Sequence, residues 1–233
     1  MSLPKLNTPT YTTKIPSTGK SIKFRPYLVK EEKVLMLAME SENETEIFDA
    51  IKLAIESCTF GAVDINKLTT FDLEHLFLQL RIKSVGETTE LGLKCEKCEK
   101  VHKVEVDLTK IKLDMNKSKD VSNKIMLTDD VGITMKYPTI DEFQNFNGDS
   151  VMDMLKICIE TIFDENKVYK ISEQTDEEID EFIDSLGNNQ IKPIEKWLSH
   201  IPQIKYTIAF DCGNKECLHK NSITLTGLKS FFI

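Results

Sequence analysis

The sequence predicts an α+β protein in which two β-hairpins, far apart along the chain, pair with each other. Two cysteine pairs lie at turns between strand-like runs, helical patterns precede the first pair, and further helical patterns fill the insertion between the pairs. The predicted order is an N-terminal arm or hairpin, a helical segment, a first hairpin, a mainly helical insertion and a second hairpin. These segments are residues 1–29, 30–86, 87–108, 109–203 and 204–228.

The cysteine pairs specify the chemistry expected of the hairpins. Cys95 and Cys98 form a Cys-x-x-Cys turn, and Cys212 and Cys217 form a turn that is two residues wider, with Gly and Asn inside it. Gly and Asn tolerate the backbone conformations of tight turns. Two such turns can supply four thiolates to one tetrahedral metal ion. The sequence therefore predicts a zinc-ribbon-like pair of hairpins, with one structural zinc ion as the cofactor.

The other interpretations of the cysteines have weaker support. A redox disulfide in Cys-x-x-Cys usually follows a βαβ strand, and no such unit precedes Cys95. A ribbon that folds without metal remains open. His102 and His219 follow the two pairs as replacement ligands or as ordinary surface residues. Cys58 and Cys158 fall within helical patterns and are expected to be small buried hydrophobic residues. Four thiolates leave no open position for water, which argues against hydrolytic catalysis.

Composition limits the function further. The 233 residues can bury a sizeable core and carry a net charge of −8, which disfavours non-specific binding to nucleic acid. The sequence contains no run of eighteen apolar residues, and its polar N-terminus does not resemble a signal peptide. Six cysteines without such a signal indicate a reducing cytosol.

The N-terminal quarter of the chain reads as a hairpin followed by two helices. Residues 11–15 and 21–25 are strand-like and flank the turn PSTGK at 16–20. This turn lacks the earlier glycine and the flanking elements of a phosphate loop, so an ordinary turn is expected. Apolar residues at helical spacing predict helices over Val29–Glu40 and Glu44–Cys58.

A third helix, capped by Thr69, is apolar on nearly all sides. One face carries Leu73, Leu76, Phe77 and Leu80, and a second face carries Phe71, Leu78 and Ile82. Such a helix is either buried in a core or covered by a partner. The partner interpretation assigns Phe71, Leu78, Ile82 and Tyr27 to a protein-binding surface. Gly86 is expected to end this segment before the first hairpin.

The insertion combines short strands with several helices. Strands are predicted at Ile133–Tyr137 and Lys167–Ile171, and helices are predicted to begin near Thr139, to span Val151–Phe163, to run from Thr175 to Leu186, and to carry Pro193 in a first turn. Trp197 is expected in the core, with an interface as the alternative. The carboxylates of Asp176–Asp184 fit a helix N-terminus and its wet face better than an acid–base pair.

Four stretches carry a resemblance to a known family. They are KFRPYLVKEEK at 23–33, FDLEHLFLQLR at 71–81, SVGE at 84–87 and LKSFF at 228–232. Together with the cysteine hairpins, they resemble the T4-like bacteriophage baseplate hub assembly proteins. The similarity is strong over residues 20–108 and at the C-terminus, and weak over 110–200.

The resemblance implies a non-enzymatic role in building the central baseplate hub of a contractile tail, as a hub chaperone or as a hub subunit. The implied partners are hub proteins, with no nucleic acid and no membrane. The implied location is the host cytoplasm during assembly and, for a subunit, the virion baseplate. The resemblance transfers no catalytic or cofactor-binding residue, and the zinc site rests on this sequence alone. The alternative is a zinc-ribbon module that binds nucleic acid or acts in transcription.

Overall fold

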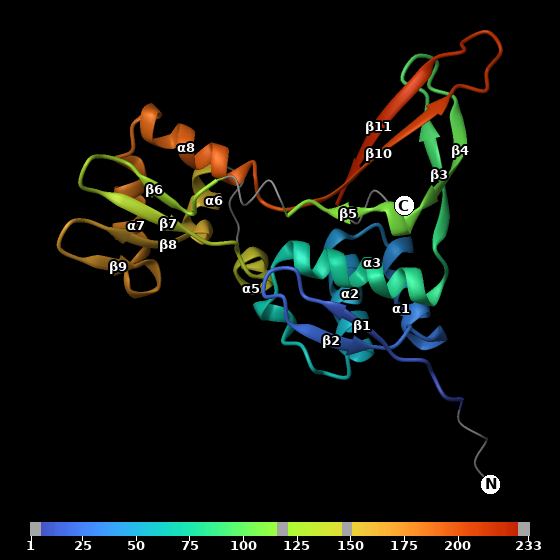
Figure 1. Ribbon diagram of the computed structural model, residues 1–233, viewed down its shortest axis with the longest axis horizontal. Helices are drawn as coiled ribbons and strands as arrows, with labels where there is room; N and C mark the ends of the chain where they lie inside the picture. Colours follow the sequence, from blue (N-terminus) through green and yellow to red (C-terminus); the bar gives the residue numbers. More distant parts are fainter. Residues whose placement is uncertain (1–5, 116–120, 146–150, 228–233) are drawn as a thin grey trace. The chain divides into compact units, whose positions relative to one another are not determined.

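The computed structural model describes residues 6–115, 121–145 and 151–227, with the backbone alone at Val151. The predicted similarity at 228–232 lies outside this part. The chain forms two compact units. Unit 1 comprises Met1–Leu113 and Gln203–Ile233, and unit 2 comprises Asp114–Pro202. The described residues of both units combine helices with small antiparallel sheets, as expected for the α+β class (Figure 1).

Unit 1 begins with a hairpin and continues with helices. The hairpin joins β1 (Tyr11–Lys14) to β2 (Ser21–Phe24), with Tyr11 opposite Phe24. The elements that follow are α1 (Val29–Glu40), α2 (Glu44–Cys58), a 3-10 turn (Ile65–Lys67) and α3 (Thr70–Ser84). The three predicted helices are thus confirmed. The apolar residues of α2 and α3 supply much of the buried core of this unit.

Polar contacts tie the first hairpin to α3. Thr69 caps α3 and shares a capping box with Asp72, whose side chain is fully buried. Ser17, in the turn between β1 and β2, donates to the Asp72 carboxylate from its backbone N–H (2.8 Å) and its hydroxyl (2.6 Å). A buried carboxylate is stable only when hydrogen bonds compensate for lost hydration. The predicted turn therefore also completes the hydrogen bonding of a core residue.

The two cysteine-bearing hairpins complete unit 1. The first joins β3 (Thr88–Lys94) to β4 (Val101–Asp107), and the second joins β10 (Ile204–Asp211) to β11 (Lys220–Thr226). A 3-10 turn (Leu108–Lys110) leads from β4 to the short strand β5 (Lys112–Leu113).

Strand β5 holds together the two points where the chain leaves and re-enters unit 1. It pairs antiparallel with the start of β10, so that Leu113 lies opposite Ile204. Unit 2 lies between these two residues in the sequence. The backbone pairing therefore fixes both ends of the insertion without any contribution from unit 2.

Unit 2 contains a four-stranded antiparallel sheet and four described helices. The strands, in sheet order, are β6 (Lys124–Met126), β7 (Gly132–Met135), β8 (Ile159–Phe163) and β9 (Val168–Lys170). The helices are α5 (Ile140–Gln144), α6 (Val151–Cys158), α7 (Asp176–Asp184) and α8 (Asn188–Leu198), with a 3-10 turn at Ile171–Glu173. Residues of β7, β8 and α6–α8 share one core, which includes Trp197 stacked on Tyr137.

Two predictions for this unit were wrong in detail. The helix predicted over 151–163 ends at Cys158, and Ile159–Phe163 forms β8. The apolar residues Ile159, Ile162 and Phe163 keep helical spacing, but β-branched and aromatic residues favour a strand here, and pairing with β7 decides for it. Pro193 lies in the second turn of α8 rather than the first, because Gly187 caps a helix that begins at Asn188. The insertion therefore contains a central sheet that the sequence indicated only in part.

The sheet also explains one glycine. A Cβ at Gly132 in β7 would clash with the ring of Phe163 and lie 2.9 Å from the backbone oxygen of Ile125. Gly132→Ala is expected to destabilise unit 2 by about 1–3 kcal/mol through overpacking. Urea unfolding followed by tryptophan fluorescence measures it. Gly187→Ala is the control for overpacking, since its nearest neighbour would lie at 3.5 Å and its expected cost is only the preference of a helix N-cap for Gly over Ala. Equal stability of the G132A and G187A proteins would contradict the prediction.

Candidate metal centre and other candidate sites

The tips of the two hairpins bring four cysteines together. The sulfurs of Cys95, Cys98, Cys212 and Cys217 all lie within 4.8 Å of one another. Across the hairpins, Cys98 and Cys212 lie 3.6 Å apart, and Cys95 and Cys217 lie 3.9 Å apart. A tetrahedral thiolate site with metal–sulfur bonds of about 2.3 Å has sulfurs about 3.8 Å apart. The cluster can therefore hold one metal ion.

The thiols are all free, and the sulfur distances exceed a disulfide bond of about 2.05 Å. Two ligands come from each hairpin, across more than a hundred residues of sequence. Cys95 and Cys212 are buried, whereas Cys98 and Cys217 are half-buried. With four protein ligands, a bound metal has no open position for water. Such a centre can stabilise a fold but cannot activate a water molecule.

Backbone N–H groups point at the sulfurs of the first turn. Burial raises the pKa of Cys95, but hydrogen bonds from the N–H groups of Cys98 and Lys97 outweigh it and lower that pKa to about 6. The N–H of Lys100 lowers the pKa of Cys98. In the second turn, burial dominates, and the pKa of Cys212 is raised to about 12. Backbone N–H groups of both turns thus point at cysteine sulfurs, and these hydrogen bonds favour the thiolate form that binds a metal.

The two histidines near the cluster differ in their contacts. His102, on β4, reaches across to the second hairpin, with Nε2 3.3 Å from the Cys212 sulfur. His219 points instead to Glu96, 3.8 Å away. Neither belongs to the group of four ligand atoms. The sequence predicted that both histidines are either replacement ligands or surface residues. His102 is instead a neighbour of a cysteine sulfur, within reach of a hydrogen bond.

The residues predicted to bind a partner lie mostly inside unit 1. Phe71, Leu78 and Ile82 are buried, so the apolar character of α3 on all sides reflects a core position. Tyr27 is half-buried; burial raises its pKa to about 12, and its backbone N–H donates to Ser84. Of the two expectations for α3, the core position thus accounts for these buried side chains, and the assignment of a partner surface to Phe71, Leu78, Ile82 and Tyr27 stays a prediction.

Helix α1 exposes apolar side chains instead. Val29, Val34, Met36 and Leu37 are all exposed, Leu37 by 66%. Val29, Met36 and Leu37 fall within about 100° of one another around a helix of 3.6 residues per turn, in an arc that also contains the exposed Lys33 and Glu40. We call these three residues the α1 apolar face. Apolar spacing predicted this helix, but spacing alone does not show which of its residues a neighbour covers.

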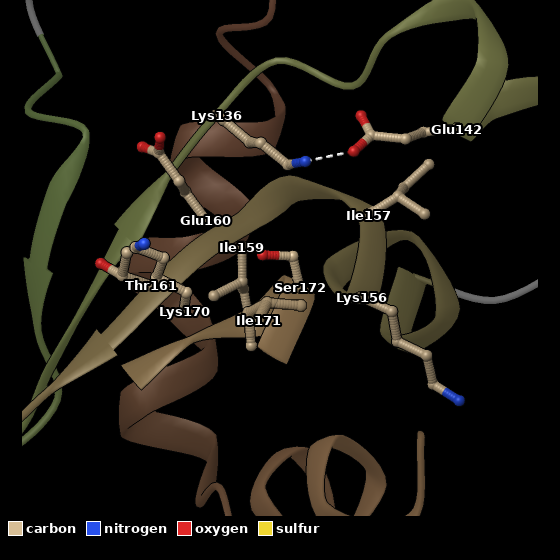
Figure 2. A pocket seen from close by; sticks show the side chains of 10 residues that line it. All are labelled: Lys136, Glu142, Lys156, Ile157, Ile159, Glu160, Thr161, Lys170, Ile171 and Ser172. Atoms are coloured by element: carbon tan, nitrogen blue, oxygen red, sulfur yellow. Dashed lines mark hydrogen bonds and ion pairs between the residues drawn. The ribbon is translucent and has the colours of Figure 1, made fainter. Parts of the chain in front are cut away.

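Unit 2 carries an open hollow of about 390 Å³, drawn in Figure 2. Its lining combines Ile157, Ile159 and Ile171 with three lysines. Each lysine is paired with a carboxylate: Lys136 with Glu142, Lys156 with Asp180 and Lys170 with Glu173. The positive charge that would attract an anionic ligand is thus largely neutralised by the protein itself.

Comparison with known proteins identifies the family of the chain. The model of a family described as T4 bacteriophage base plate protein matches residues 8–233, which include both units and all four clustered cysteines. No curated protein and no solved structure matches the chain significantly. In the described residues, no helix is long and apolar enough to cross a membrane. The match confirms the resemblance to T4-like baseplate proteins, and the chain belongs to the T4 bacteriophage base plate protein family.

Proposed function

We propose that this protein is a non-enzymatic component of baseplate hub assembly, acting on hub proteins as a chaperone or as a subunit of the hub. The family match over nearly the whole chain is the observation that carries this proposal. The work is done in the host cytoplasm while the baseplate is built. A subunit would then remain in the virion, whereas a chaperone would leave.

The α1 apolar face supports a role in assembly. Apolar side chains that cluster on one side of an exposed helix mark protein contact sites more often than scattered ones do. Val29 and Leu37 are 64% and 66% exposed, respectively. Because the chain belongs to a family of baseplate proteins, we assign this face to a hub protein with a complementary apolar surface. The burial of about 100 Å² of apolar area contributes about 2.5 kcal/mol.

We further propose that the cysteine cluster binds one structural zinc ion, so that the paired hairpins form a zinc ribbon. The sulfur separations of 3.6 and 3.9 Å support this metal, and four thiolates are a common donor set of structural zinc. The ion joins β3–β4 to β10–β11, and it therefore links the two stretches of sequence that make up unit 1. The rigid unit holds α1 in position for its partner.

A pull-down tests the assembly role and the α1 apolar face together. Tagged protein is recovered from cells in which the phage is assembling, and the captured proteins are identified by mass spectrometry. We expect baseplate hub proteins with the wild type and at least tenfold less of them with Leu37→Asp. Leu37 is exposed, so the substitution leaves the fold intact. The matched control is Val168→Asp on β9, which changes an equally exposed apolar residue of unit 2.

The outcomes of this pull-down separate the possible roles. If the wild type captures no hub protein, the assembly role is wrong. If L37D captures as much as the wild type, only the assigned surface is wrong. The net charge of −8 argues against the alternative that the protein binds nucleic acid. Salt-dependent binding of the wild type to DNA would support that alternative over ours.

A further inference from the structure

The two cysteine turns have equivalent residues when the hairpins are aligned on their second cysteines, Cys98 and Cys217. One residue later, Glu99 and Leu218 both adopt left-handed backbone angles, with φ of 59° and 49°. This conformation is uncommon for residues other than glycine and costs about 1 kcal/mol or more per residue. Two non-glycine residues at the same offset indicate that both turns are held in one required shape.

The equivalence continues at the second residue after each of these cysteines. The N–H groups of Lys100 and His219 bond the sulfurs of Cys98 and Cys217, respectively. The backbone oxygens of the same two residues accept the N–H groups of the first cysteines, Cys95 (3.0 Å) and Cys212 (2.8 Å). The two turns therefore share their backbone hydrogen bonding, although the second is two residues longer.

At the fourth residue after each second cysteine, the side chain crosses to the other hairpin. From β4, His102 places Nε2 3.3 Å from the sulfur of Cys212. From β11, Asn221 accepts the backbone N–H of Glu96, beside Cys95, at 2.9 Å. Asn221 is only 2% exposed, and its side-chain NH₂ group is 3.2 Å from the backbone oxygen of His219.

The geometry points to His102 and Asn221 as reciprocal positioning residues of the metal centre. Each of them holds the first cysteine of the opposite hairpin, or the residue beside it, in place. This inference rests on the proposed metal site. A metal-bound thiolate sulfur carries no proton, so at Cys212 the sulfur accepts and His102 donates through Nε2–H. The side chain of Asn221 holds the Cys95–Cys98 turn by accepting the backbone N–H of Glu96. Each hairpin thus completes the hydrogen bonding around the first cysteine of the other, and metal loading is coupled to hairpin docking.

The substitution His102→Phe tests the inference at the contact between His102 and the Cys212 sulfur. His102 lies with its ring 5.9 Å from that of Phe210, so Phe keeps an aromatic ring there while removing the N–H donor. We expect His102→Phe to weaken zinc binding 10- to 100-fold, the usual loss for a residue that orients a metal ligand. His102→Gln, which retains an N–H donor, is expected to restore most of it. His200→Phe is the matched control, because that imidazole bonds the backbone oxygen of Lys196 in unit 2, and it is expected to change affinity less than threefold.

Two measurements separate positioning from folding. Zinc affinity is obtained by competition with a chromophoric chelator, and the sulfur-to-metal charge-transfer band is recorded with saturating cobalt(II). Loss of the donor to Cys212 should shift this band in H102F at full occupancy, whereas a purely structural loss would not. If wild type binds zinc tightly and H102F matches it in affinity and spectrum, the positioning role is overturned. If wild type binds neither metal, the proposed metal site fails, and this inference fails with it.

Discussion

Replacement of Cys212 by serine is expected to abolish zinc binding and to separate the two hairpins of unit 1. Cys212 is 2% exposed, and its sulfur lies 3.6 Å from that of Cys98 in the other hairpin. Structural zinc in small domains contributes about 10–16 kcal/mol of apparent binding free energy at neutral pH. Loss of one of four thiolates removes enough of this to favour the metal-free state. We therefore expect C212S to contain less than a tenth of the zinc of the wild type.

The location of the single tryptophan makes this prediction specific to one unit. Trp197 lies in the core of unit 2, and all four cysteines of the cluster lie in unit 1. In urea, the tryptophan fluorescence transition should stay where it is in the wild type. Alkylation of Cys95 and Cys98 should become fast in C212S already without denaturant.

The matched control for C212S is Cys58→Ala, which removes a buried thiol of unit 1 outside the cluster. Its zinc content should equal that of the wild type. One zinc per chain in C212S, measured by elemental analysis, would contradict the assignment of Cys212 as a ligand. Iron in place of zinc in the wild type would keep the four ligands but change the metal.

The cysteine pattern was readable from the sequence because it depends on local spacing. Cys-x-x-Cys between alternating runs specifies a turn with two sulfurs on one side, and a second such turn is the natural partner. The residues that contact the cysteine turns from the opposite hairpin could not be predicted from the sequence. His102 and Asn221 take equivalent positions only when the turns are aligned on the second cysteine, and the unequal spacing hides that alignment. The usual signal of a left-handed residue, a glycine, is absent at Glu99 and Leu218.

Apolar periodicity predicted most helices but misassigned one stretch. Residues 159–163 continue the helical spacing of α6, and only their pairing with β7 identifies them as a strand. Helix α3 shows the opposite problem. Its apolar residues were read correctly as needing cover on several sides, but the sequence does not show whether the cover is the protein's own core or a partner.

A buried ion pair in unit 1 was also not predicted from the sequence, because the groups that bond its carboxylate come from separate elements. Glu31, near the start of α1, is 8% exposed and accepts Arg25 Nη2 at 2.8 Å and Ser57 Oγ at 2.9 Å. Its other carboxylate oxygen accepts the backbone N–H of Leu28 at 2.8 Å. One carboxylate thus joins the end of β2, the first turn of α1 and the last turn of α2.

Glu31→Ala is therefore expected to destabilise unit 1 by about 3–5 kcal/mol, the usual cost of leaving the other member of a buried ion pair uncompensated. Arg25 is also only 8% exposed and would keep its charge in that position. Chemical denaturation followed by circular dichroism measures the loss. Glu40→Ala removes an exposed carboxylate of the same helix and is expected to cost less than about 0.5 kcal/mol.

The same carboxylate predicts how stability depends on pH. Burial acts to raise the pKa of Glu31, but hydrogen bonds from Arg25, Leu28 and Ser57 outweigh it and lower that pKa to about 2. Because the pKa is lower in the folded than in the unfolded chain, the unfolded chain binds the proton first as pH falls. Glu31 therefore contributes its full stabilisation above about pH 4.5, and loses it between there and pH 2, by about 3 kcal/mol in total. Glu31→Gln, which cannot ionise, should lose less stability than the wild type over this interval. Parallel pH profiles of the two proteins would show that the carboxylate is not held ionised by Arg25.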